Sequence, residues 1–294
     1  MNVQSDLSVS LVAAEIPIDD QRERRAYLRQ QVFFWLPLGV LVLIAAACFI
    51  GPLVLPIASS TGGSIVVANR AVFSAGHLLG TDPSGNDNLS KVLYGGRVSL
   101  EVGFATVFIG LVVGGGLGAI AGQRGGWAEL LISRLFDALL SFPALVLAIV
   151  IASYLGPSEL HVIYAISFFS IPAVGRLARA NTLRIRSSTF FSAARISGAG
   201  EWSILWRHIA PNILPALLTF SFLSVSVSII AEAALSFLGL GVPPPNPSWG
   251  NMLALGEQYL DLRPVLLFIP AIAIFLTILS LNLAGDALRA RWAE

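Results

Sequence analysis

Few residues of this sequence carry side chains that could do chemistry, because apolar residues dominate the chain. The most unusual is Glu232, a single carboxyl group within a long apolar run that also holds Ser224 and Ser228. Placing a carboxyl group in a hydrocarbon interior costs about 2.5 to 3.5 kcal/mol on insertion scales, so such a group usually has a function. Ser224 and Ser228 are one helical turn apart and share a face. We predict that Ser224, Ser228 and Glu232 line a polar path, or alternatively that each makes structural hydrogen bonds.

The remaining reactive side chains do not form a catalytic or metal-binding set. His77, His161 and His208 are isolated, and no pair of them has the spacing of metal ligands. Cys48 is the single cysteine, so no disulfide forms within the chain. The phosphate-binding sequence GxxxxGK[ST] is absent, and the one lysine, Lys91, stands outside any such motif. We therefore expect no catalytic residue, no metal and no bound cofactor in this chain.

Composition identifies the elements that must position these residues. Hydrophobic residues make up 55% of the 294 residues and charged residues only 12%, whereas a soluble domain has about 25% charged residues. A bilayer core about 30 Å thick is crossed by about 20 apolar residues of helix. The sequence predicts an all-α, polytopic membrane protein with six transmembrane helices. The six apolar runs lie within residues 32–55, 98–122, 136–155, 162–175, 213–233 and 264–285.

Basic residues are distributed unequally between the two sides that six crossings would create. Fourteen of the eighteen lysine and arginine residues fall on the side of the two termini, and four fall on the other side. Loops on the cytoplasmic side of a membrane collect basic residues. We therefore expect a multi-pass protein of a prokaryotic cell membrane with both termini cytoplasmic. The same bias explains the basic segment 176–188, next to membrane lipid, without any binding of nucleic acid.

One segment on the cytoplasmic side, FSAARISGAGEWSILWRHIAPN at residues 191–212, is amphipathic. Gly198 lowers helix propensity before this stretch becomes helical, and Pro211 follows it, so we expect a bent surface hairpin that ends before the next span. On pattern alone, the hairpin either docks with a partner or lies flat on the membrane with its tryptophans at the headgroups. We expect its apolar stripe to anchor it to the bundle. That stripe consists of Trp202, Leu205, Trp206 and Ile209.

The same segment resembles the cytoplasmic signature loop of permease subunits from binding-protein-dependent ABC importers. That loop reads Glu-Ala-Ala, three residues, a glycine and, about a dozen residues on, a proline. The ending His-Ile-x-Pro-Asn, here at 208–212, is typical of the dipeptide and oligopeptide branch. Ser192 stands where the family has Glu, and Ala210 stands where it has Leu. The matching positions are Ala193, Ala194, Gly198 and Pro211.

Three further segments resemble the C-type permease subunits of the peptide importers in this family. They are HLLGTDPSGNDNLSKVLYGGRVSLEVG at 77–103, LSFLGLGVPPPNPSWGNML at 235–253 and LNLAGDALR at 281–289. With the signature loop they form four segments in the family order, from about residue 77 to the C-terminus. The resemblance implies the type I permease fold of ABC importers.

The resemblance also implies a function and a set of partners. The chain would be a non-catalytic subunit that forms half of the channel of an ATP-driven importer for short peptides, either dipeptides or oligopeptides. The implied partners are a second homologous permease subunit, two ATP-binding subunits that carry ATP and magnesium, and an extracytoplasmic substrate-binding protein. The signature loop would dock on the ATP-binding subunits. The implied docking residues are Ala193, Ala194, Arg195, Gly198, Ala199, Gly200, Glu201 and Trp202.

Three other functions fit parts of the sequence. Related permeases import nickel or glutathione through the same architecture. A secondary transporter driven by an ion gradient would use Glu232 as its proton or cation site and would have inverted repeats and broken helices at mid-membrane. A non-transporting membrane scaffold would have no ATP-binding partner.

The second apolar run has four glycines at four-residue spacing. Such a face permits close contact between helices in lipid, where packing drives association. We expect it to pack against another helix of this chain or against the second permease subunit. These glycines are Gly110, Gly114, Gly118 and Gly122.

The hydrophobic runs and the loops between them divide the chain into segments. The extracytoplasmic loop is too short for a core of its own, and we expect it to cap the outer mouth or to contact the binding protein. The proline run at 243–247 predicts a stiff outer loop. The expected segments are a cytoplasmic N-terminal tail (1–31), the first transmembrane helix (32–55), the extracytoplasmic loop (56–97), the permease core (98–287) with the cytoplasmic coupling loop (188–211), and a cytoplasmic C-terminal tail (288–294).

Overall fold

The computed structural model describes residues 20–54 and 62–293, with side chains for 35–54 and 62–292, and no β-strand occurs among them. Residues 1–19 of the expected cytoplasmic N-terminal tail lie outside the described residues. The same holds for residues 56–61 of the expected extracytoplasmic loop. The helices are α1 (Asp20–Phe49), α2 (Gly51–Val54), the 3-10 turn η1 (Ile65–Val67), α3 (Asn88–Ile109), the π-helical segment η2 (Gly110–Gly115), α4 (Gly116–Arg124), α5 (Gly126–Leu140), α6 (Ala144–Leu155), α7 (Glu159–Arg186), α8 (Thr189–Ile196), α9 (Glu201–Ile204), the π-helical segment η3 (Leu205–Ile209), α10 (Ala210–Phe237), α11 (Trp249–Gln258) and α12 (Val265–Ala293).

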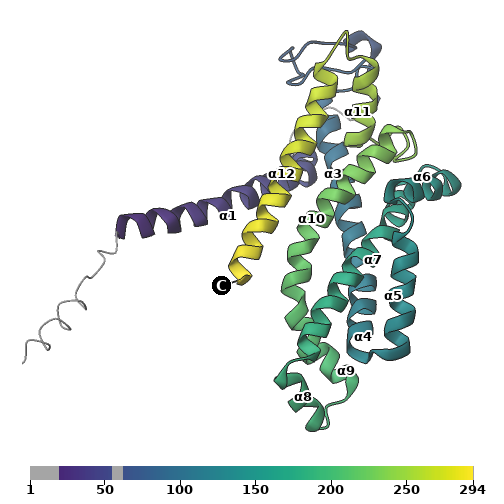
Figure 1. Cartoon of the computed structure of the whole chain (residues 1–294). Coiled ribbons are helices and arrows are strands. Elements are labelled where there is room, and N and C mark those ends of the chain that lie inside the picture. Colours follow the sequence, from purple (N-terminus) through teal and green to yellow (C-terminus); the bar gives the residue numbers. More distant parts are fainter. Residues whose placement is uncertain (1–19, 55–61, 294) are drawn as a thin grey trace, which may run out of the picture.

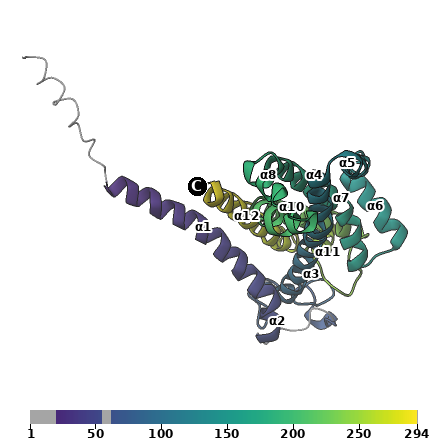
Figure 2. The same cartoon turned by 90° about the horizontal axis from the view of Figure 1, so that it is seen from below.

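The molecule is elongated, with two ends of different character (Figure 1). One end carries α11 and the segment 62–87, and we name it the α11 end. The opposite end carries α8 and α9, and we name it the α8 end. Figure 2 shows α1 running away from the bundle toward its own N-terminus, while its other end meets α3 and α12. α1 is anchored there by Cys48, which is buried in the core.

Four helices are long and apolar enough to cross a membrane. They are Asn88–Arg124, Glu159–Arg186, Glu201–Phe237 and Val265–Trp292. α5 and α6 form a fifth span if the pair, bent by 83°, crosses as one unit. The apolar helical stretch Trp35–Phe49 is shorter. The described residues therefore support four or five spans, and the expected number of six stays a prediction.

The expected continuous span 136–155 is wrong in one respect, because the chain turns sharply inside it. α5 ends at Leu140 and α6 begins at Ala144, with Ser141, Phe142 and Pro143 between them. Pro143 has no amide hydrogen to continue the helix, and it disfavours helical backbone at the residue before it. The apolar run is therefore divided between two helices.

The helix after the signature segment is continuous, which corrects the expected end at Pro211. Residues Glu201–Phe237 form one span of 37 residues that passes through Pro211 and Pro215. The π-helical segment η3 directly precedes Pro211. A π-helical turn is wider than an α-helical turn and is a recognised way for a helix to absorb such an interruption. At 1.5 Å per residue this helix is about 55 Å long, so it extends well beyond a bilayer core of about 30 Å.

The core consists of three clusters of buried side chains, and α10 contributes to all of them. The cluster near the α11 end joins α1, α3, α10, α11 and α12 around Trp249. A second, near the α8 end, joins α4, α7, α8 and η3 to α10 around Phe191 and Ile209. A third joins α3, α6 and α7 to α10. α10 is therefore the central element of the fold.

The four spaced glycines pack against α7 of the same chain. A Cβ atom at Gly110 would overlap the Ser170 side chain, and one at Gly114 would overlap the Ile171 carbonyl oxygen. At Gly118 and Gly122 the neighbours are also residues of α7. Only glycine allows the two backbones to approach this closely, so the glycine face fixes the pairing of η2 and α4 with α7.

Candidate functional site

The first candidate site is the segment that joins α8 to α9. α8 ends in a left-handed turn at Gly198, whose φ is +79°, and the amides of Ser197 and Gly198 bond to the carbonyls of Ala193 and Arg195. Glycine is the residue that most easily adopts this backbone conformation. A Cβ at Gly198 would meet nothing within 4 Å. The turn is therefore open to the surroundings on its outer side.

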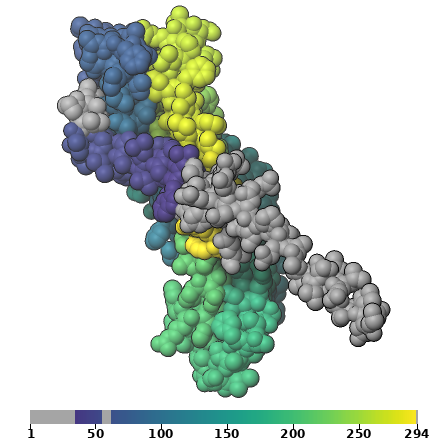
Figure 3. Space-filling view, turned by 90° about the vertical axis from the view of Figure 1, so that its left-hand side faces the viewer, coloured from purple at the N-terminus to yellow at the C-terminus, as the bar shows by residue number. Residues whose placement is uncertain are grey.

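Most of the docking residues implied by the resemblance lie on the surface of this segment. Figure 3 shows the α8 end, in green and teal, projecting beyond α12 in yellow. Ala194 and Ala199 are half-buried. Phe191 is buried and attaches α8 to the core, whereas Ile196 on the opposite side is exposed. The exposed docking residues are Ala193, Arg195, Gly198, Gly200, Glu201 and Trp202.

The expected anchoring stripe is wrong for its two tryptophans. Trp202 and Trp206 are each 64% exposed, and their rings pack edge to face with centroids 6.3 Å apart. The buried face is formed by Ile204, Leu205 and Ile209 instead. In the wider turns of η3, Leu205 and Ile209, four residues apart, share the buried face, while the two tryptophans share the exposed one. Two indole rings are therefore available for a partner or for the membrane surface.

Polar contacts hold the start of α9 against the end of α4. The Gln123 side-chain amide donates to the Glu201 carbonyl oxygen at 2.7 Å, and Arg124 pairs with the Glu201 carboxylate at 3.0 Å. Both side chains of the ion pair are more than half exposed. Arg179 of α7 pairs with Glu129 of α5 in the same region. The pair of Arg124 with Glu201 is exposed and so contributes little to stability, whereas the pair of Arg179 with Glu129 is partly buried.

The two path serines share a cavity, and the structure places Glu232 away from it. Ser224 and Ser228 line an apolar cavity of about 300 Å³ formed by α6, α7 and α10. The Ser224 hydroxyl donates to the Phe220 carbonyl at 3.0 Å and keeps a lone pair free to accept. This cavity contains no charged side chain. It can therefore offer hydroxyl groups and apolar surface to a solute.

Glu232 is completely buried in this conformation, and its expected place on the path stays a prediction. Ser99 of α3 donates to Oε2 and Ser236 to Oε1, each at 2.7 Å. The hydroxyl of Ser248 lies close enough to the carboxyl group to affect it. The side chain does not line the cavity that holds Ser224 and Ser228. We therefore interpret Glu232 as a structural acceptor in this conformation, which was the alternative for this residue.

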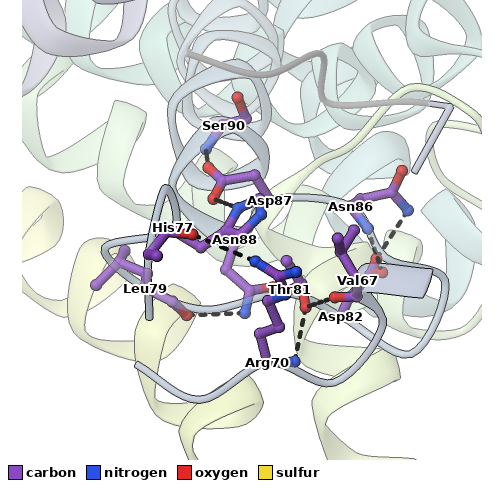
Figure 4. Close-up of polar contacts among 11 residues, drawn as sticks. Val67, Arg70, His77, Leu79, Thr81, Asp82, Asn86, Asp87, Asn88 and Ser90 are labelled. Carbon is purple, nitrogen blue, oxygen red and sulfur yellow. Dashed lines mark hydrogen bonds and ion pairs between the residues drawn. The ribbon is translucent and has the colours of Figure 1, made fainter. Parts of the chain in front are cut away.

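The segment 62–87 at the α11 end is ordered by a network of short polar contacts (Figure 4). Asp82 accepts hydrogen bonds from the amides of Ser84 and Asn86 at 2.8 Å and pairs with Lys91 at 2.8 Å. Burial raises the pKa of Asp82, but the hydrogen bonds from Lys91 and Asn86 outweigh it and hold that pKa below its ordinary value. The Asp87 carboxylate accepts from the Ser90 amide and so caps α3.

This segment forms one wall of a larger cavity at the α11 end. The cavity has a volume of about 690 Å³ and is also lined by the prolines at 243–247 and by α11. Arg263, between α11 and α12, donates to the carbonyls of Asn69 and Arg70 and ties the segment to the helices. The expected cap over one mouth of the bundle is consistent with this arrangement.

Sequence reasoning missed the polar partners of Glu232 and of Glu201. Ser236 was within reach of sequence analysis, because it stands one helical turn after Glu232. Ser99 is 133 residues from Glu232, and Arg124 is 77 residues from Glu201, so no local spacing points to either pair. No group of three or more potential metal ligands occurs in the part of the chain that the structure describes.

Several long apolar helices with few buried charges define the class of this protein as a multi-pass membrane protein. The chain belongs to the family of binding-protein-dependent transport system inner membrane components, whose family model matches residues 114–294. The resemblance predicted from the four sequence segments is thereby confirmed. Family membership contradicts the alternatives of an ion-gradient-driven transporter and of a non-transporting scaffold.

Curated relatives and solved structures agree with this assignment. The glutathione transport system permease protein GsiD of Pectobacterium atrosepticum is 41% identical over 90% of this chain and 87% of its own length. The dipeptide transport system permease protein DppC of Alkalihalophilus pseudofirmus is 41% identical over 74% of this chain and 71% of its own length. An inward-facing structure of the MetNI methionine ABC transporter matches 68% of this chain and 95% of the matched chain, with a TM-score of 0.57 and 19% identity. This last likeness confirms the all-α importer permease fold.

Proposed function

We propose that this chain is one of two permease subunits that form the channel of an ATP-driven importer of short peptides. The relatives that support this are named as permeases for a dipeptide and for glutathione, which is itself a tripeptide. ATP and magnesium belong to two separate ATP-binding subunits, and a substrate-binding protein delivers the peptide at the α11 end. The apolar cavity with Ser224 and Ser228 is the candidate section of the path within this subunit.

The observation that carries the proposal is the exposed surface around Gly198. Its residues match the signature loop of the family, they project beyond the membrane helices, and Ile196 and Trp202 expose large apolar side chains there. An exposed apolar patch of this kind on an otherwise polar turn is suited to contact with another protein. The basic residues on this side favour a cytoplasmic α8 end, where the ATP-binding subunits would dock.

Glutathione is a second candidate cargo, because a glutathione permease is 41% identical to this chain over 90% of the length of this chain. A dipeptide and glutathione differ in length and charge, so uptake can separate them. Proteoliposomes that contain the complete transporter and its binding protein would be supplied with a labelled dipeptide or with labelled glutathione. If only one of the two unlabelled compounds reduces the uptake of label, that compound is the cargo.

The docking surface is tested with Gly198→Asp in the complex purified from its native membrane. We expect the variant to insert normally but to lose the ATP-binding subunits, because a charged side chain enters an open surface that a partner must cover. Gly156→Asp is the matched control, since Gly156 also has a positive φ, of +83°, and nothing within 4 Å of its Cβ position. Gly156 lies between α6 and α7, away from the α8 end.

Co-purification and ATPase activity decide the outcome. The proposal holds if wild type and Gly156→Asp retain two ATP-binding subunits and ATPase activity while Gly198→Asp loses both. If Gly198→Asp keeps its ATP-binding subunits and transports at the wild-type rate, the docking assignment is wrong. Quenching of Trp202 and Trp206 fluorescence by brominated lipid would then favour a segment that lies on the membrane surface.

A further inference from the structure

We propose that Glu232 is a positioning residue that locks the connection between α10 and α11 to α3, so that these elements move as one body. The lock consists of Glu232 and the hydroxyls of Ser99, Ser236 and Ser248, and we name these four residues the carboxylate junction. The junction follows from the structure alone. Its role during transport rests on the proposed function.

The carboxylate junction joins three parts of the chain at one buried acid. Ser99 belongs to α3, Glu232 and Ser236 belong to α10, and Ser248 stands directly before α11. The four residues are between 0% and 2% exposed. Ser99 and Ser236 each bond to a different carboxylate oxygen at 2.7 Å. The two oxygens of a carboxyl group can accept such bonds at the same time, because each carries lone pairs.

Each of the three hydroxyls also accepts a backbone amide hydrogen from the connection between α10 and α11 or from the start of α11. The Ser99 oxygen accepts from the amide of Trp249 at 3.3 Å, and the Ser236 oxygen from the amide of Val242 at 3.4 Å. The Ser248 oxygen accepts from the amide of Asn251 at 3.2 Å and so caps α11. A hydroxyl has one hydrogen, and for Ser99 and Ser236 donating it to Glu232 leaves the lone pairs for these amides, while Ser248 lies beside the same carboxyl group. Three backbone positions are thereby connected to one acid.

Close packing makes the same connection rigid. A Cβ at Gly250 would lie 2.6 Å from the Ala233 carbonyl oxygen, and one at Gly241 would overlap Ser236. Trp249 is 1% exposed, and its indole nitrogen donates to the Val92 carbonyl of α3 at 3.0 Å. The start of α11 is therefore inserted between α3 and α10. It cannot move away from them without breaking several buried hydrogen bonds, each of which is costly to leave unmade.

The contact of α10 with α6 and α7 is of a different kind. Among the described residues, no side-chain hydrogen bond or ion pair connects α10 with either helix. The apolar cavity of about 300 Å³ lies between the three helices. Apolar contacts across a cavity can shift with little loss of specific interactions. The glycine face contacts α7 only at residues 170–182, in the half of α7 that leads to the α8 end. The π-helical segment η2 lies between α3 and α4, and helices bend at such segments. Relative motion at the α11 end is thus expected between α10 and the first half of α7 with α6, and not between α10 and α11.

The lock is tested by cysteine accessibility of Val242→Cys in the complete complex in nanodiscs. Val242 is 3% exposed, so a water-soluble maleimide should label the introduced cysteine slowly. Combining it with Ser99→Ala or Glu232→Gln should raise the labelling rate about tenfold, because each removes a buried bond of the junction. Ser226→Ala is the matched control. Ser226 is also buried on α10, but its hydroxyl bonds only to the Phe222 carbonyl of its own helix.

Cys48 is the single native cysteine and is buried. Labelling of the same variants without Val242→Cys measures how much Cys48 contributes to the labelling rate. The lock is overturned if Ser99→Ala and Glu232→Gln label at the parent rate, or if Ser226→Ala accelerates labelling equally. Ser99→Ala keeps the experiment decisive if Glu232→Gln does not fold. The labelling result stands whether or not ATP-binding subunits co-purify, so failure of the lock is distinguished from failure of the proposed function.

The one-body motion is tested with pairs of spin labels at exposed positions of the otherwise intact complex. Asn246 lies in the connection between α10 and α11, Phe104 on α3 and Tyr154 on α6. Between the nucleotide-free and vanadate-trapped complexes, the distance from 246 to 154 should change while the distance from 246 to 104 stays constant. The inference is contradicted if the distance between 246 and 104 changes as much as the distance between 246 and 154. It is also contradicted if the distance between 246 and 154 does not change. In Glu232→Gln the distance from 246 to 104 should become broad, with basal ATPase activity retained and peptide-stimulated activity lost.

Discussion

The two ends of the molecule are held together by opposite means. Near the α11 end, buried hydroxyls and backbone amides converge on the carboxylate of Glu232, and the segment 62–87 is ordered around Asp82. Near the α8 end, glycines bring α4 against α7, and the polar contacts of α9 are exposed. Buried hydrogen bonds are costly to leave unmade and so fix one geometry, whereas exposed ion pairs exchange readily with water. The comparison indicates a fixed α11 end and an α8 end that can adjust to a docking partner.

The largest expected effect comes from adding one methyl group to the glycine face. Gly114→Ala places a Cβ against the Ile171 carbonyl of α7, which requires the two helices to separate. We expect a loss of about 3 kcal/mol of stability or more, because backbone atoms cannot yield as a flexible side chain does. Gly116→Ala is the control, since nothing lies within 4 Å of that Cβ position. Thermal unfolding of the detergent-solubilised protein, followed by size-exclusion chromatography, measures both; equal stabilities would show that the close packing is not needed.

A smaller effect is expected from acid at the α11 end. The pKa of Asp82 is held below its ordinary value in the folded state, so its ionised form stabilises the segment 62–87. This contribution is complete above the ordinary pKa of an aspartate, about 4, and is lost as the pH falls through the lower folded-state pKa. Hydrogen exchange of the amides of Ser84 and Asn86, corrected for intrinsic rates, should therefore accelerate only in strong acid.

Two variants check the assignment of this pH dependence. Asp82→Asn should accelerate exchange already at neutral pH and remove the acid-dependent step, because the amide cannot pair with Lys91. Asp261→Asn removes an exposed carboxyl group near the same end and should leave the profile unchanged. An acid-dependent step that survives in Asp82→Asn would assign the titration to another group.

The smallest effect is expected for the ion pair between Arg124 and Glu201. Both side chains are more than half exposed, so Arg124→Glu should cost only about 0.2 to 1 kcal/mol in the isolated subunit. The double variant Arg124→Glu with Glu201→Arg should restore the pair, and the difference should disappear at high salt. Thermal unfolding of the four members of this double-mutant cycle measures the coupling. A coupling of several kcal/mol would show that the α8 end is as firmly fixed as the α11 end.

Much of the architecture could be predicted from the sequence because its causes are local. Apolar runs of sufficient length predict helices that cross a membrane, since every backbone polar group must be satisfied within lipid. Glycines at four-residue spacing predict a close helix contact, and the signature positions around Gly198 predict the family. The sequence did not identify the partner of that glycine face, because any helix with small residues would satisfy the same pattern.

The tertiary structure decided which polar groups meet. Glu232 is apart in sequence from Ser99 and Ser248, and only the packing of α3 and α11 against α10 brings the three together. The exposure of Trp202 and Trp206 depends on the π-helical turn before Pro211, which a regular helical period does not include. The class of the protein therefore follows from composition and local pattern. The role of the buried Glu232 depends on contacts between distant segments, which only folding creates.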